Sequence, residues 1–137
     1  MIVLADTSAV YALIDASDAW HKRVVEWWAA AKSEVKVPTT VLPEISHLLM
    51  NRLGWRAEEA FIRSVADREF EIEPLESEDI ERAADLIQVY SDLPLGFVDA
   101  SLVAMAERLE AREVLTTDRR HFSVVRPSHV KLFTLLP

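Results

Sequence analysis

Four acidic residues of this sequence stand in surroundings that are otherwise largely apolar. Asp6, Glu44 and Asp99 are each the only charged residue of a long apolar stretch, and Asp118 directly follows the uncharged run 114–117. A buried carboxylate is costly unless hydrogen bonds, a raised pKa or a cation compensate it. Four such carboxylates that converge in the folded chain would therefore suit a divalent metal ion.

The chemistry that such a cluster suits is phosphodiester hydrolysis. Carboxylate oxygens are hard ligands that favour Mg²⁺ or Mn²⁺ over softer metals, and Mg²⁺ keeps several waters when a few carboxylates bind it. One or two such ions orient and activate water, neutralise the scissile phosphate and stabilise the leaving oxygen. We therefore expect a metal-dependent nuclease site if the four acids meet.

Each acid alone also has a purely structural explanation. Asp6 or Asp118 would serve as the cap of a helix, and Glu44 or Asp99 would interact favourably with the positive end of a helix dipole. Helix starts are enriched in Asp and Glu for these reasons. Only the combination of all four favours a shared site over four separate caps.

The elements that must position these acids alternate between short strands and helices. Five β-rich runs are predicted to be strands: Ile2–Ala5, Val35–Val37, Phe70–Pro74, Val114–Thr116 and Val130–Leu135. Helices are predicted at Ala19–Lys32, Val41–Leu53, Ala57–Arg68, Ile80–Ile87 and Val98–Leu109. In the last two segments apolar residues recur every three or four positions, so both helices are expected to face the sheet. This alternation predicts an α/β fold with a largely parallel sheet.

On this outline the four acids share one edge of the sheet. Asp6 follows the first strand and Asp118 follows the fourth, while Glu44 and Asp99 stand at the starts of helices. In parallel α/β sheets, ligands bind beyond the carboxyl ends of the strands and beside helix N-termini. We therefore expect the acids to meet at this edge.

The composition indicates a globular protein of one domain, residues 1–137. Hydrophobic residues make up 50% of the chain and charged residues 28%, a slight apolar excess that favours a buried oligomer or partner interface. The absence of cysteine excludes disulfides and makes a reducing cytoplasm the default location. With no signal peptide and no apolar run of membrane-spanning length, a soluble cytoplasmic protein without a membrane partner is expected.

Charge constrains how nucleic acid would be bound. The net charge of −8 argues against binding by general phosphate attraction, although not against a metal-dependent nuclease. Basic residues gather near the C-terminus, at Arg119, Arg120, His121, Arg126, His129 and Lys131. This cluster forms either a phosphate-facing edge beside Asp118 or an ordinary solvated surface, and the sequence leaves both open.

The segments around the acids resemble a known family. These segments are residues 6–8, 41–45, 95–100 and 115–122, which read DTS, VLPEI, LGFVDA and LTTDRRHF. Together they resemble the four signature segments of the PIN-domain ribonucleases, above all the VapC-type toxins of bacterial and archaeal toxin-antitoxin pairs. The resemblance covers nearly the whole chain, in order and at family-like spacing, and the ordered set is far more specific than any one segment.

This resemblance implies a three-layer α/β/α PIN domain around a central, mainly parallel sheet of roughly five strands. It implies an endoribonuclease that hydrolyses RNA with Mg²⁺, with Mn²⁺ able to substitute. It further implies a homodimer and a cognate antitoxin whose tail covers the active site and places a basic side chain among the acids.

Carried over by position, the resemblance also assigns roles to residues. Asp6 and Asp99 become the direct metal ligands, while Glu44 and Asp118 complete the acidic site or act through water. Hydroxyl residues that would orient these carboxylates, or instead cap helices and turns, are Thr7, Ser8, Thr116 and Thr117. The expected contacts to substrate are Arg119 and Arg120.

Other chemistries find less support in the sequence. The histidines lack a metal-ligand spacing, and His47 lies on an apolar helix where a core histidine is expected. Ser8 lacks the Gly-x-Ser-x-Gly context of a serine nucleophile, and a phosphatase using Asp6 lacks the second nearby Asp. The phosphatase stays a minor alternative. Two others stay open: a PIN-like module that binds without cutting, and a nuclease that acts on DNA.

The tryptophans have two interpretations. Trp20, Trp27 and Trp28 share one predicted helix, and Trp55 follows another. Large aromatic side chains dominate buried area, so core packing is the simpler interpretation. The alternative is a groove for an antitoxin helix or for a second copy of the chain.

Overall fold

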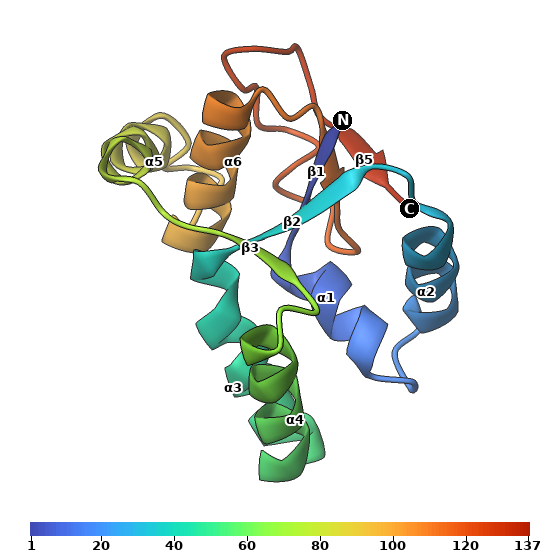
Figure 1. The fold of residues 1–137 in the computed structure, drawn as a ribbon. Coiled ribbons are helices and arrows are strands. Elements are labelled where there is room, and N and C mark those ends of the chain that lie inside the picture. The colour runs from blue at the N-terminus through green and yellow to red at the C-terminus, as the bar shows by residue number, and fades with distance from the viewer.

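A five-stranded sheet forms the centre of the computed structural model, which describes residues 1–137 (Figure 1). The strands are β1 Ile2–Ala5, β2 Glu34–Pro38, β3 Glu71–Glu73, β4 Glu113–Leu115 and β5 Thr134–Leu136. They lie in the order β3-β2-β1-β4-β5, and every neighbouring pair is parallel. The carboxyl ends of all strands therefore lie at one edge of the sheet.

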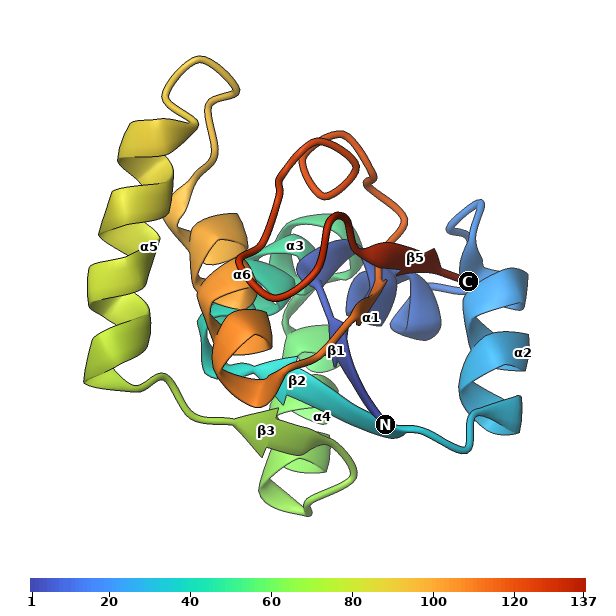
Figure 2. The ribbon, with the colours of Figure 1, turned by 90° about the horizontal axis from the view of Figure 1, so that it is seen from above.

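Helices cover both faces of this sheet. They are α1 Thr7–Ile14, α2 His21–Ala30, α3 Leu42–Leu53, α4 Trp55–Ala66, α5 Ser77–Val89 and α6 Phe97–Leu109, with a 3₁₀ helix, η1, at Thr39–Val41. Seen from above, α5 and α6 lie on one side of the sheet and α1 and α2 on the other (Figure 2). The hairpin of α3 and α4 extends beyond the carboxyl edge of the strands (Figure 1).

Alternation along the strands divides the core into two clusters. Leu4 and Val114, which are paired in register, belong to the cluster that contains the buried residues of α5 and α6. Their neighbours Val3 and Leu115 belong to the cluster formed with α1, α2, α3 and α4. Since successive strand side chains point to opposite faces, this division confirms the predicted three-layer α/β/α arrangement with a parallel five-stranded sheet.

Two elements differ from the sequence-based expectation by more than three residues, whereas the bounds of the others shift by three residues or fewer. The last strand begins at Thr134 rather than Val130, because His129 Nε2 bonds the carbonyl of Ala111 at 2.6 Å and Phe133 packs edge-on against Phe122. The strand ladder then starts where the Thr134 N–H donates to the carbonyl of Arg112. Residues 7–14 form the helix α1, which was not among the predicted helices.

The expectation that the helix at 80–87 faces the sheet is wrong. α5 packs on α6 instead, through Ala83 and Leu86, which belong to the same buried cluster as the side chains of α6. α6 is buried on nearly every side from Ala100 to Ala106 and occupies the place next to the strands. Ile80 and Ile87 are consequently 49% and 38% exposed.

The tryptophans divide between the two interpretations. Trp20, Trp27 and Trp28 pack against the cluster of α1, α2, α3 and α4, as the core interpretation predicts. Trp55, at the start of α4, is 57% exposed and has no such role.

None of the helices combines the length and the apolar character needed to cross a membrane.

Candidate active site

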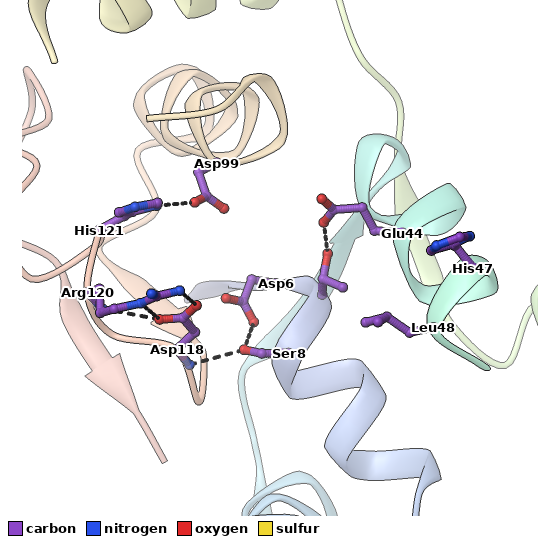
Figure 3. A pocket seen from close by; sticks show the side chains of 10 residues that line it. Asp6, Ser8, Glu44, His47, Leu48, Asp99, Asp118, Arg120 and His121 are labelled. Carbon is purple, nitrogen blue, oxygen red and sulfur yellow. Dashed lines mark hydrogen bonds and ion pairs between the residues drawn. The ribbon is translucent and has the colours of Figure 1, made fainter. Parts of the chain in front are cut away.

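One pocket at the carboxyl edge of the sheet brings all four predicted acids together (Figure 3). Asp6 directly follows β1, Asp118 lies three residues after β4, and Glu44 and Asp99 occupy the first turns of α3 and α6. The lining residues are Asp6, Thr7, Ser8, Glu44, His47, Leu48, Asp99, Asp118, Arg120 and His121. Segments far apart in sequence thus supply one acidic pocket.

Asp6 is the most buried of these acids, with 6% of its surface exposed. Its Oδ1 accepts hydrogen bonds from the backbone N–H of Ala9 at 3.0 Å and from the Ser8 hydroxyl at 2.7 Å. The bond from Ala9 makes Asp6 the N-terminal cap of α1. Its Oδ2 accepts from the Thr116 hydroxyl at 2.5 Å. Burial, aided by the negative charge of Asp99, raises the pKa of Asp6 to about 6 despite these hydrogen bonds.

The hydroxyl residues predicted to orient the carboxylates differ in their hydrogen-bond partners. Ser8 Oγ accepts the backbone N–H groups of Thr117 at 3.0 Å and of Asp118 at 3.2 Å, so it joins the start of α1 to the segment after β4. Thr7 donates to Glu44 Oε1 at 2.5 Å. The side chain of Thr117 forms no hydrogen bond, and this residue acts only through its backbone.

The two acids on the other side of Asp6 have basic partners. His121 Nδ1 donates to Asp99 Oδ2 at 2.6 Å. Arg120 binds Asp118 through two hydrogen bonds of 3.0 Å and 2.9 Å, and these bonds hold the pKa of Asp118 below its usual value. With Glu44 bonded to Thr7, three of the four carboxylates thus bond to residues that line the pocket with them.

Arg119 lies outside this pocket, unlike its neighbour Arg120. Its guanidinium lies 5.4 Å from the ring centroid of Trp20 and donates to the carbonyl of Pro137 at 2.8 Å. This placement ties the segment after β4 to α2 and to the last strand region. The position of Arg119 does not support its predicted contact with substrate. Arg120, by contrast, lines the pocket.

Three lining residues were not predicted as site residues. His47 was expected in the core, but it is exposed on α3 and lines the pocket beside Leu48. The available signal was helical spacing, because both stand one turn after Glu44 and share its side of the helix. His121 belongs to the predicted basic cluster and to the signature segment that contains Asp118, but its contact with Asp99 was not predicted.

The donor set of the pocket fits a hard divalent cation. All four acids supply oxygen ligands, which Mg²⁺ and Mn²⁺ prefer, and the raised pKa of Asp6 beside Asp99 marks a place where a positive charge is favourable. In their present orientations, no three acidic or histidine side chains lie close enough together to hold a metal ion. A metal ion shared by three carboxylates would therefore require at least one of these side chains to move.

Comparison with known proteins identifies the family. Residues 3–126 match the model of the PIN domain. The chain belongs to the PIN domain family. This PIN-domain protein is 36% identical over 135 residues to Ribonuclease VapC26 of Mycobacterium tuberculosis, an alignment that covers 98% of the chain and 100% of VapC26. The resemblance to VapC-type PIN ribonucleases is thereby confirmed.

Solved structures share the fold. The crystal structure of VapC20, a sarcin-ricin loop cleaving toxin of Mycobacterium tuberculosis, superposes with a TM-score of 0.83 at 26% identity and covers 94% of this chain and 98% of VapC20. A structure of VapBC2 from Rickettsia felis, bound to a DNA fragment from its promoter, gives a TM-score of 0.72 at 14% identity with 100% coverage of both chains. At that identity the second similarity establishes the fold alone.

Proposed function

We propose that this single PIN domain is an endoribonuclease that hydrolyses RNA phosphodiester bonds in the four-acid pocket and acts as the toxin of a VapC-type pair. The observation that carries the proposal is the pocket itself. Asp6, Glu44, Asp99 and Asp118 line it together, in a chain that is 36% identical over nearly its full length to a protein named as a ribonuclease.

A divalent metal ion is the cofactor that the pocket supports, and we assign Mg²⁺, with Mn²⁺ able to substitute. Asp6 and Asp99 would hold it directly, with Glu44 and Asp118 completing the site. When bound, such an ion activates water and neutralises charge at the scissile phosphate. The oxygen-only donor set supports this choice over zinc.

The surrounding residues keep the carboxylates in place. Ser8 and Thr116 fix the two oxygens of Asp6, and His121 holds Asp99 from the opposite side. Arg120 is 80% exposed at the pocket rim, where its guanidinium now binds Asp118. A substrate phosphate offers this guanidinium an equivalent pair of oxygen acceptors, so we assign Arg120 to the RNA backbone.

The substrate that fits best is an exposed loop of structured RNA. VapC20 is a sarcin-ricin loop cleaving toxin, and this chain superposes on it over 94% of its length. A protein of net charge −8 gains little from general phosphate attraction and must recognise local features. Sequence-specific RNA recognition generally uses unstacked bases in loops, which a pocket can enclose.

The expected partners are a cognate antitoxin and a second copy of the chain. Solved VapBC complexes from Rickettsia felis and Salmonella typhimurium share this fold, which supports an antitoxin partner for this chain. Exposed Trp55 and Ile62 on α4 supply apolar surface for a partner helix. The acidic pocket supplies a site for a basic side chain of that partner.

Cleavage of matched RNA and DNA hairpins of identical sequence tests the proposed substrate. Purified wild-type protein with Mg²⁺ is expected to cut the RNA and to leave the DNA intact, and Asp99→Asn is expected to cut neither. Equal cleavage of both would support the DNA nuclease. Binding of RNA without any cleavage, in protein shown to be free of antitoxin, would support the binding module.

A further inference from the structure

The active pocket has two walls of different chemistry (Figure 3). The segment after β4 supplies Arg120 and His121, which accompany the acids Asp118 and Asp99. The opposite wall is α3, where His47 and Leu48 follow Glu44 by one helical turn. No lysine or arginine lines the α3 wall, so it is suited to a part of the substrate other than phosphate.

The α3 wall is a continuous stripe. Glu44, His47, Leu48 and Asn51 stand at positions i, i+3, i+4 and i+7, which lie along one side of a helix. Another side of α3 is buried in the core. The stripe therefore starts at the acids and runs away from them, toward the exposed end of the helix hairpin.

The ring of His47 is held in a defined orientation. Asn51 Nδ2 lies 2.9 Å from His47 Nε2, and since an amide N–H can only donate, Nε2 is the acceptor. Both residues are exposed, and Asn51 forms no other side-chain hydrogen bond. The faces of the imidazole and the carbonyl oxygen of Asn51 remain available to a ligand.

An apolar side chain adjoins this ring. Leu48 is the single hydrophobic residue among those that line the pocket, and it is next to His47 in the chain. A flat aromatic ring, an apolar contact and a free carbonyl oxygen are groups with which proteins bind unstacked RNA bases. The wall thus has the chemistry of a base-binding surface within reach of the hydrolytic site.

We propose that His47 and Leu48 contact the face of an unstacked base next to the scissile phosphate, and thereby help to determine where RNA is cut. Asn51 is the positioning residue, because it holds the imidazole. The proposal rests on the ribonuclease function proposed above and adds the residues that select the cleavage position. On this division, Arg120 contacts the backbone and α3 contacts the base.

The test compares intact and abasic substrates. Wild-type cleavage of total cellular RNA first maps a cut site, and a synthetic RNA spanning that site is then made intact and with single abasic residues flanking the cut. Cleavage rates are measured for wild type, His47→Ala and Asn51→Ala. Met50→Ala is the matched control, because Met50 is exposed on the same helix and does not line the pocket.

On intact RNA, His47→Ala is expected to lower kcat/KM by about 5- to 150-fold, the factor by which loss of one aromatic platform weakens base stacking. Asn51→Ala is expected to cause a smaller loss, and Met50→Ala none. With the abasic RNA that removes the contacted base, wild type and His47→Ala are expected to cleave equally slowly. A purely structural defect would lower cleavage of both substrates by the same factor.

Several results would overturn the inference. Cleavage of intact RNA by His47→Ala at the wild-type rate would contradict a base contact. Loss of the same factor on every substrate would contradict it as well. A variant that cleaves normally but escapes antitoxin inhibition would make α3 a protein-binding wall. Absence of cleavage by wild-type protein would instead overturn the ribonuclease function itself, which distinguishes the two failures.

Discussion

The hydroxyl of Thr116 lies 2.5 Å from Oδ2 of Asp6 and joins the carboxyl ends of β4 and β1 across 110 positions of sequence. Thr116 is fully buried, and Ser8 makes a second link between the same segments. The orientation of Asp6 is therefore set by the fold itself. A carboxylate held in this way needs little reorganisation when a ligand arrives.

Replacing this hydroxyl tests whether it tunes Asp6. Thr116→Val keeps the shape of the side chain but removes a hydrogen bond that lowers the pKa of Asp6, so that pKa is expected to rise further above about 6. The acidic limb of the pH–rate profile for RNA cleavage should then move to higher pH. Thr116→Ser keeps the hydroxyl and should retain the wild-type profile; a Val variant with an unshifted limb would exclude this role.

Asp6→Asn is expected to stabilise the protein while it abolishes cleavage. The pKa of Asp6 is about 6 in the folded chain against an ordinary value of 3.8, so the folded state binds the proton more tightly. The free energy of unfolding should therefore fall by about 3 kcal/mol from this group as pH rises from about 4 to above 6. Asn cannot ionise, and it should not show this fall.

Denaturant unfolding of wild type and Asp6→Asn from pH 4 to pH 8 measures that difference. Subtracting the two curves cancels the titration of groups that do not interact with Asp6, because the proteins differ at one residue. The variant is expected to be the more stable protein above pH 6, with the advantage vanishing near pH 4. A pH-independent difference would mean that burial does not control the charge of Asp6.

Binding of a divalent ion should reverse the cost of the clustered carboxylates. A ligand that binds only the folded state at ten times its Kd stabilises by about 1.4 kcal/mol. Mg²⁺ is therefore expected to raise the Tm of wild type at pH 7.5, and to raise it less at pH 5, where Asp6 is mostly protonated. Asp99→Asn should show no such increase. NaCl of equal ionic strength, without divalent cations, is the control for general salt effects.

Arg119 and Arg120 form a natural pair of matched variants. Arg120→Ala removes an exposed guanidinium at the pocket rim, so KM for RNA is expected to rise on the order of tenfold with Tm unchanged. Arg119→Ala removes the contacts to Trp20 and Pro137, so Tm should fall while the cleavage rate per folded molecule persists. The reverse pattern would show that the two arginines have been assigned the wrong roles.

The location of the four acids was easier to predict from the sequence than the residues that surround them. Asp6 and Asp118 follow strands that are β-rich and buried, and parallel strands bring such positions to one edge. Glu44 and Asp99 follow helix starts that periodicity marks clearly. These are local signals, which is why the meeting of all four acids was predictable before the fold was known.

The unpredicted features depend on contacts between distant segments. His47 looked like a core residue because its neighbours are apolar, and only the placement of α3 at the sheet edge exposes it. Arg119 and Arg120 are adjacent and chemically alike, yet Trp20 of the α2 region captures one of them. Apolar residues recur along α5 with the spacing of a helix that faces a sheet, but α6 occupies the position beside the strands.

Cleavage of total cellular RNA by the purified protein tests the central claim most directly. Wild type with Mg²⁺ is expected to give discrete cuts that EDTA abolishes, and Asp99→Asn, folded as judged by circular dichroism, is expected to give none. Cuts that persist in EDTA, or in the Asp99→Asn variant, would contradict a metal-dependent ribonuclease site built from these four acids.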